Sequence, residues 1–130
     1  MNFDGAIFKE MGATGLGVVI RDFKGIVIGA LAEQISLPNF VATVEALACR
    51  RAVLFTKEMS IFEATFKGDV ETVTNVLKDG GSNHPKFSHV INDSLVLASA
   101  FCFCSFSHVR RSGNSVAHFL ARKYKFGNEL

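Results

Sequence analysis

The chain has 130 residues, 48% of them hydrophobic, and a formal net charge of +2 at pH 7. This length fits one domain, residues 1–130, that can bury a substantial core, and the apolar content excludes a disordered chain. No apolar run approaches the ~20 residues that cross a membrane, and so small a charge does not by itself indicate a nucleic-acid-binding protein.

The first third of the sequence predicts an antiparallel meander. Three strands are expected, at Phe3 to Phe8, Gly17 to Arg21 and Ile26 to Ile35. The glycine cluster Gly12, Gly15 and Gly17 predicts a turn between the first two. The segment Asp22-Phe23-Lys24-Gly25 is typical of a hairpin turn between the second and third.

The rest of the sequence alternates helical and strand patterns. Apolar residues spaced three and four apart predict a helix with one buried stripe, made of Val41, Val44, Ala48, Ala52, Phe55 and Met59. A strand at Ile61 to Phe66 follows, and then a helix from Asp69 that stops at Gly80-Gly81. A further helix from Phe87 to Ala98 leads to a strand at Phe101 to Ser107, and Gly113-Asn114 begins the last helix. The strand Phe101 to Ser107 is apolar on both faces, so we expect it to be central. The order β-β-β-α-β-α-α-β-α predicts a mixed sheet with helices on its faces.

Three acidic residues are candidate site residues: Asp4 in N-F-D-G-A, Glu45 in V-E-A-L and Asp69 in F-K-G-D. Carboxylates brought together from a strand, a helix and a strand end can hold a hard cation. Each acid also has an ordinary alternative, as a turn residue, a helix former and a helix N-cap, respectively. Glu45 borders the buried stripe, where an unpaired carboxylate is costly unless a metal or an Arg compensates it.

Taken together, the motifs resemble the plant reverse-transcriptase-like RNase H domains, of RNase H type 1. These occur in non-LTR retroelements and as stand-alone plant genes. The motifs follow in order as N-F-D-G-A, G-L-G-V-V-I-R-D-F-K-G, V-E-A-L-A-C-R-R-A, F-K-G-D and F-S-H-V-R-R-S-G-N-S-V-A-H-F-L-A-R. The resemblance covers nearly the whole chain. It implies an α/β, ribonuclease H-like fold, in which a five-stranded mixed sheet of three antiparallel and then two parallel strands carries helices on both faces.

The resemblance also implies an activity and its residues. Active members cut the RNA strand of an RNA–DNA hybrid, with carboxylates holding two Mg²⁺ ions about 4 Å apart. Asp4, Glu45 and Asp69 match the first three catalytic carboxylates, which hold the metal. Mg²⁺ is therefore the expected cofactor, with Mn²⁺ as an alternative. His108 matches a mobile histidine that assists product release.

The chain departs from the pattern at His118, where active members carry a fourth catalytic Asp. Imidazole suits Mn²⁺ or Zn²⁺ better than Mg²⁺, so His118 is either a retained ligand or a helix residue that has drifted from Asp. Three acids and a neutral His leave one positive charge of two Mg²⁺ ions uncompensated. The segment between Gly80 and Phe101 is also too short, and too poor in Lys and Arg, for the basic handle of some members.

The expected partner is an RNA–DNA hybrid or another nucleic acid, read by its shape, phosphates and 2′-hydroxyls. In this fold Arg110 and Arg111 lie near the substrate groove, where they contact phosphates or form a solvated loop. Asn114 matches the Asn that opens the last helix and is assigned to nucleic-acid binding with them. We expect a monomer without a membrane partner.

Three functions stay open. The first is a metal-dependent RNA–DNA hybrid endonuclease, and the second is a degenerate RNase H-like module that binds nucleic acid or a protein without cutting. The third is an orphan retroelement fragment with no selected function. The chain begins almost directly on a candidate strand, which we interpret as a cut domain or a truncated gene product. Three cysteines and no secretory segment predict a reducing compartment, the nucleus or cytoplasm.

Overall fold

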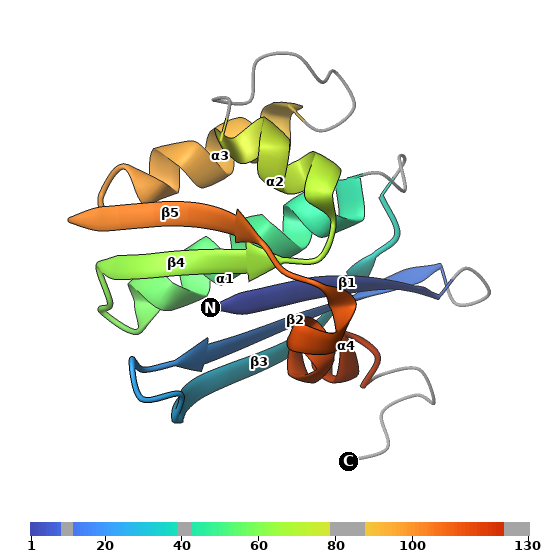
Figure 1. Ribbon diagram of the computed structural model, residues 1–130. Helices are drawn as coiled ribbons and strands as arrows, with labels where there is room; N and C mark the ends of the chain where they lie inside the picture. Colours follow the sequence, from blue (N-terminus) through green and yellow to red (C-terminus); the bar gives the residue numbers. More distant parts are fainter. Residues whose placement is uncertain (9–11, 39–42, 79–87, 124–130) are drawn as a thin grey trace.

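The computed structural model describes residues 1–8, 12–38, 43–78 and 88–123 (Figure 1). The strands are β1 (Asn2–Phe8), β2 (Ala13–Arg21), β3 (Val27–Ser36), β4 (Glu63–Gly68) and β5 (Phe103–His108). The helices are α1 (Val44–Glu58), α2 (Glu71–Lys78), α3 (Ser88–Ala98) and α4 (Ser115–Ala121), with a 3₁₀ turn, η3 (Arg111–Asn114), before the last. The expected helix stop at Gly80-Gly81, and the apolar positions Val41 and Phe87, lie outside the described residues. None of the described helices is long and apolar enough to cross a membrane.

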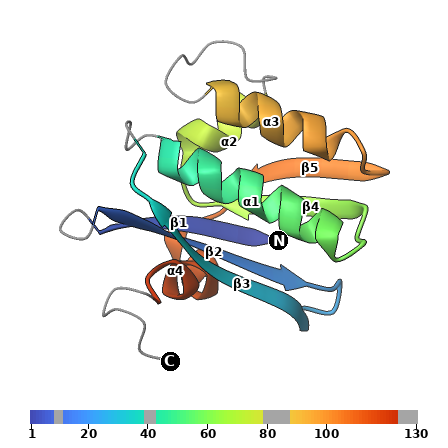
Figure 2. The same ribbon diagram turned by 180° about the vertical axis from the view of Figure 1, so that it is seen from behind.

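The five strands form one mixed sheet in the order β3-β2-β1-β4-β5. The β1–β2 and β2–β3 pairs are antiparallel, whereas β1–β4 and β4–β5 are parallel. Helices α1 and α3 lie side by side on one face, with α2 beside α3, and α4 covers β1 and β2 on the other face (Figures 1 and 2). The sheet composition and the two helical layers expected from the sequence are thus confirmed.

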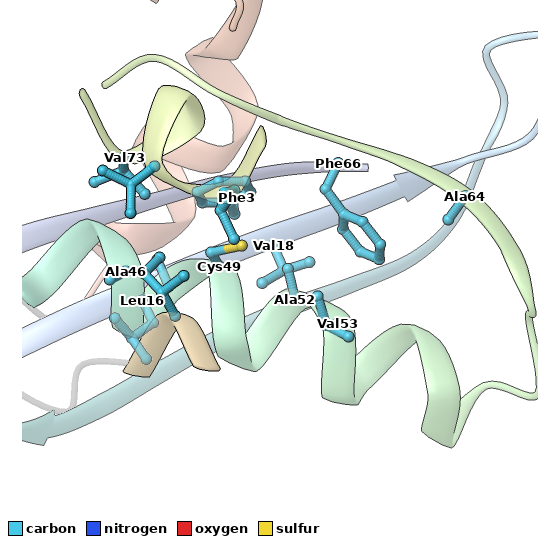
Figure 3. Close-up of a cluster of buried hydrophobic side chains, with 14 residues drawn as sticks. Phe3, Leu16, Val18, Ala46, Cys49, Ala52, Val53, Ala64, Phe66 and Val73 are labelled. Carbon is cyan, nitrogen blue, oxygen red and sulfur yellow. The ribbon is translucent and has the colours of Figure 1, made fainter. Parts of the chain in front are cut away.

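The main hydrophobic core lies between the sheet and α1. Phe3 of β1, Val18 of β2 and Phe66 of β4 meet Cys49 and Ala52 of α1 there (Figure 3). All five are 2% exposed or less. Small residues on the helix and large rings on the sheet interdigitate at close range, as dense packing requires. This packing holds the start of α1 over β1, where the acidic residues lie.

The expected turn at the glycine cluster is wrong for Gly15, which lies within β2. Gly17, which the sequence places both in this turn and at the start of the second strand, also lies within β2. Only Gly12, with a φ of +60°, has the left-handed conformation among these three. A Cβ on Gly15 would meet the backbone carbonyl of Ala121, and one on Gly17 that of Ala117. The two strand glycines therefore allow α4 to lie directly on the backbone of β2.

The expectation that the last strand is central is also wrong, because β5 is an edge strand and β1 is the middle one. The apolar run begins before the strand does. Phe101 precedes β5 and packs edge-on against Phe66 with ring centroids 5.9 Å apart. On the strand itself Phe103 is 56% exposed, and Ser105 and Ser107 share its face by the two-residue period of a strand.

Candidate active site

The antiparallel and parallel halves of the sheet meet between β1 and β4 (Figure 1). Among the described residues the two strands pair at one register position, Asn2 with Lys67. Asp4 lies two residues beyond Asn2, and Asp69 two beyond Lys67, so the parallel strands bring both acids to the same level. Open α/β sheets place binding sites where the strand order reverses in this way.

Glu45 reaches the same place from α1, of which it is the second residue. Its Oε1 accepts a hydrogen bond of 3.0 Å from the backbone N–H of Gly5. A Cβ on Gly5 would collide with the side chain of Val44, so a glycine here lets the start of α1 approach β1. Carboxyl oxygens of Asp4, Glu45 and Asp69 all lie within 4.8 Å of one another, which confirms the expected convergence of the three acids.

The three carboxyl groups are shielded from water. Asp4 is fully buried and the side chain of Asp69 is 2% exposed. Burial, and then the negative charge of Asp4, raise the pKa of Glu45 to about 9, against the lowering effect of the hydrogen bond from Gly5.

Several of these buried oxygens also lack hydrogen-bond donors among the described residues. They are Asp4 Oδ1, Glu45 Oε2 and both carboxyl oxygens of Asp69. Buried oxygens without donors are costly, and a crowded set of them is what a hard divalent cation satisfies. The residues present therefore fit a metal ion.

The alternative role of Asp69 as a helix N-cap is not realised. Helix α2 begins at Glu71, two residues later than expected. No backbone N–H in the described structure donates to either oxygen of Asp69. The expected helix start at Asp69 is therefore wrong, and its carboxyl group faces the cluster without serving the helix.

Two nitrogen-bearing side chains from the end of the chain face the acids. His118 Nδ1 lies 2.7 Å from Asp4 Oδ2. Arg111 Nε lies 2.7 Å from Asp69 Oδ2, and its Nη1 lies 3.0 Å from His118 Nδ1. One ring nitrogen carries at most one proton, so Nδ1 cannot donate to Asp4 and accept from Arg111 at once. The carboxylate is the stronger partner, which leaves the guanidinium in contact with the imidazole ring.

Sequence reasoning assigned Arg111 to nucleic acid and missed its ion pair with Asp69. The available signal is the spacing between Arg111 and His118, seven residues. Seven residues are about two helical turns, so two side chains at this spacing in a helical segment face the same way. A site residue on the last helix therefore implies that Arg111 faces the same site.

Asn114 occupies the N-cap position of α4 as expected, but its side chain makes no capping hydrogen bond. Its Nδ2 donates to the carbonyl oxygen of Phe3 at 2.9 Å, and its Oδ1 accepts from Asn2 Nδ2 at 3.0 Å. Asn114 is 1% exposed. It therefore fastens the η3–α4 segment to β1, while a contact between Asn114 and nucleic acid stays a prediction.

The remaining candidates are His108 and Arg110. His108 ends β5, is exposed, and is in register with Gly68, the residue before Asp69. Arg110 is exposed and precedes η3. Roles for His108 in product release and for Arg110 in phosphate binding stay predictions.

Comparison with known proteins places this arrangement in context. The model of the reverse transcriptase-like family matches residues 2–124. No curated protein sequence matches the chain. Solved structures that resemble it include RNase H1 of the halophilic archaeon Halobacterium salinarum NRC-1, with a TM-score of 0.84, 23% identity, and coverage of 94% of this chain and 92% of that one.

Two further structures are similar over most of their length. LC11-RNase H1, isolated from compost by a metagenomic approach, has a TM-score of 0.81, 20% identity, and coverage of 94% and 92% of the two chains. The N-terminal RNase H domain of a Mycobacterium tuberculosis protein, fused to maltose binding protein, has a TM-score of 0.80, 21% identity, and coverage of 93% and 88%. These likenesses show an RNase H-like fold, and the family match over residues 2–124 shows that the chain belongs to the reverse transcriptase-like family.

Proposed function

We propose that the chain is a nucleic-acid-binding RNase H domain that hydrolyses the RNA strand of an RNA–DNA hybrid with a divalent metal. The observation that carries this proposal is the cluster of Asp4, Glu45 and Asp69, with ligand oxygens within 4.8 Å of one another. Several of these oxygens are buried and lack donors. A cation bound among them would compensate charge that burial otherwise makes costly.

Relatives in fold support the substrate class. LC11-RNase H1 was solved in complex with an RNA/DNA hybrid. The foamy viral protease–reverse transcriptase, which covers 96% of this chain at a TM-score of 0.69 and 18% identity, was solved with double-stranded DNA. In our proposal the exposed Arg110, and Arg111 when it is free, contact backbone phosphates, which position a duplex without reading its sequence.

The proposed ion is Mg²⁺, because the three acids offer only oxygen ligands. Mn²⁺ is the alternative, because His118 offers an imidazole nitrogen beside Asp4. When bound, such an ion supplies Lewis acidity and activates water for attack on a phosphodiester. The chain holds the ion with Asp4, Glu45 and Asp69, and Asn114 keeps the last helix in place against β1.

A second candidate is a module that binds nucleic acid, or a protein, without cutting. The favouring observation is the pairing of the acids with protein groups, His118 with Asp4 and Arg111 with Asp69, each at 2.7 Å. His118 stands where active members of the family carry a fourth carboxylate. Arg111 neutralises the charge of Asp69, and His118 occupies Oδ2 of Asp4. A second metal ion would otherwise use both, so in this candidate the site binds fewer ions than a four-acid site.

The proposal extends to origin and context. The motif F-S-H-V-R-R-S-G-N-S-V-A-H supports a place among the RNase H domains of plant non-LTR retroelements or stand-alone plant genes. We propose that the domain acts inside the cell, in the nucleus or cytoplasm, as a monomer.

Cleavage of an RNA–DNA hybrid labelled on its RNA strand tests the function, with Mg²⁺, with Mn²⁺, and with a chelator. Asp4→Asn is the control, because it keeps the shape of the side chain and removes its charge. Metal-dependent cleavage that this change abolishes supports the nuclease. Binding that weakens as salt rises, as release of counterions from phosphates requires, but with no cleavage, supports the second candidate. No cleavage and no binding would reject the nuclease and the nucleic-acid-binding module, and would favour a protein-binding module or an orphan fragment.

A further inference from the structure

The guanidinium of Arg111 lies where a cation bound to the acids would compete with it. Its Nε is 2.7 Å from Asp69 Oδ2. The approach is that of an ion pair without a hydrogen bond, because neither oxygen of Asp69 accepts one from the described residues. Arg111 therefore neutralises the charge of Asp69 but leaves the lone pairs of its oxygens unsatisfied.

We propose that Arg111 is a displaceable counter-cation of the carboxylate cluster. It neutralises Asp69 in the metal-free protein, it is displaced when a divalent ion binds, and its release makes it available to a nucleic-acid phosphate. This inference rests on the proposed metal site.

The surroundings of Arg111 permit this movement. Its side chain is 62% exposed, whereas that of Asp69 is 2% exposed. The backbone of the segment is held by Asn114, which donates to Phe3 and accepts from Asn2. The long side chain of Arg111 can therefore leave while η3 stays in place. A divalent ion that replaces the guanidinium keeps the charge of Asp69 compensated, so the displacement does not leave a buried carboxylate unpaired.

In this proposal Arg111 reaches a phosphate of the nucleic acid only after its guanidinium has left Asp69. A metal ion that takes Asp69 frees Arg111 for nucleic acid, and nucleic acid that takes Arg111 frees Asp69 for metal. Such coupling is reciprocal, so each ligand raises the affinity for the other by the same factor. Arg111 would therefore make the protein bind metal more tightly when nucleic acid is bound than when it is absent.

The direct test is calorimetric titration of Mn²⁺ into the free protein, without nucleic acid. Arg111→Ala should bind Mn²⁺ at least about two- to fivefold more tightly than the unmodified chain. That is the range for an exposed ion pair, and the Asp69 partner here is buried. The matched control is Arg110→Ala, which removes the same charge from the adjacent exposed residue that has no ion pair among the described residues. Its effect should be clearly smaller. Equal gains in both variants, or none in Arg111→Ala, would overturn the inference.

A second measurement tests the coupling. Binding of a hybrid is measured with and without Ca²⁺, taken as a probe that occupies oxygen sites. The factor by which Ca²⁺ strengthens binding should be smaller in Arg111→Ala than in Arg110→Ala, and an unchanged factor would contradict the release of Arg111 to phosphate. Absence of metal binding in all variants would reject the metal site and the proposed function with it. Metal binding that ignores Arg111 would reject only the present inference.

Discussion

The Nδ1 atom of His118 lies 2.7 Å from Oδ2 of Asp4, so a helix side chain and a fully buried strand carboxyl group meet at the centre of the site. This contact gives one oxygen of Asp4 a partner, while Oδ1 has no donor in the described part of the chain. A cation that enters the cluster therefore shares Asp4 with His118. The identity of residue 118 should then govern both metal affinity and metal-free stability.

We predict that His118→Asp increases Mg²⁺-dependent cleavage and lowers the Mg²⁺ concentration that cleavage requires. The change supplies a fourth oxygen ligand and a negative charge, and its effect should be larger with Mg²⁺ than with Mn²⁺, which accepts imidazole more readily. Without metal the variant should lose about 1–3 kcal/mol of stability, because Asp4 loses its donor. Cleavage rates over a range of Mg²⁺ concentrations, and melting curves with and without Mg²⁺, measure both effects.

His118→Asn is the matched control for this prediction, since it offers a side chain of the same shape as Asp without the charge. A gain in cleavage with Asp but not with Asn assigns the effect to charge. Unchanged cleavage by a folded His118→Asp variant would mean that a feature other than residue 118 limits cleavage, or that the domain no longer cuts.

Asp69→Asn should abolish metal-dependent cleavage and weaken metal binding by more than the ~10–100-fold typical of groups that only support a ligand. The amide keeps the size of the side chain but cannot supply the charge that holds a hard cation. Asp93→Asn is a suitable control, because Asp93 is an exposed carboxylate on α3 that pairs with Arg50. Full cleavage by the Asp69 variant would show that the cluster is not the metal site.

Metal affinity should rise with pH because Glu45 must lose a proton to bind metal. Its pKa of about 9 in the folded chain lies above the ordinary value of 4.5. In metal-free protein, the stability linked to Glu45 is therefore present below about pH 4.5 and is lost as the pH rises toward 9. Metal binding depends on pH in the opposite way, because it releases the proton of Glu45 between about pH 4.5 and 9. For one released proton, the metal affinity rises by up to about tenfold per pH unit.

Titrations between pH 6 and 8, in buffers of different ionisation enthalpy, count the protons that metal binding releases. Glu45→Gln is the control, because its amide oxygen can still accept the N–H of Gly5. The release should fall in this variant. A metal affinity independent of pH would contradict the prediction.

Gly17→Ala should destabilise the chain by about 1–3 kcal/mol, the usual range for overpacking. The new Cβ would meet the backbone carbonyl of Ala117 and force α4 away from β2. Gly29→Ala is the matched change on β3, where the nearest contact is the flexible end of Met59 at 3.3 Å. Chemical denaturation of the two variants compares them, and equal losses would argue against close packing of α4 as the reason for glycine at position 17.

The parts of the structure that follow from short stretches of sequence could be predicted. The hairpin at Asp22 is one, since its Oδ1 accepts hydrogen bonds from the N–H groups of Lys24 and Ile26 at 2.9 and 3.0 Å. The buried stripe of α1 is another, at Val44 and Ala48, although Met59 lies beyond the helix end and is exposed. In each case the residues that decide the structure lie within a few turns of one another.

The features that could not be predicted from the sequence are contacts between segments that lie far apart in the chain. Nothing near Gly15 in sequence indicates that Ala121 will pack against it. The apolar run around Phe103 does not indicate that the strand will be left at the edge of the sheet. The pair of Arg111 and Asp69 joins residues 42 positions apart. Such contacts depend on how helices and strands pack against one another, and the pattern of residues within one helix or strand does not specify that packing.

The narrow junction between β1 and β4 has a mechanical consequence. Asp4 belongs to the antiparallel half of the sheet and Asp69 follows the parallel half, while Glu45 comes from a helix that packs on both. An ion held by all three would act as a cross-link between halves that share one register pair among the described residues. Amide hydrogen exchange should then slow on β1 and β4 together when Mg²⁺ is added. Slowing on one strand alone would show that the ion does not cross-link the two halves of the sheet.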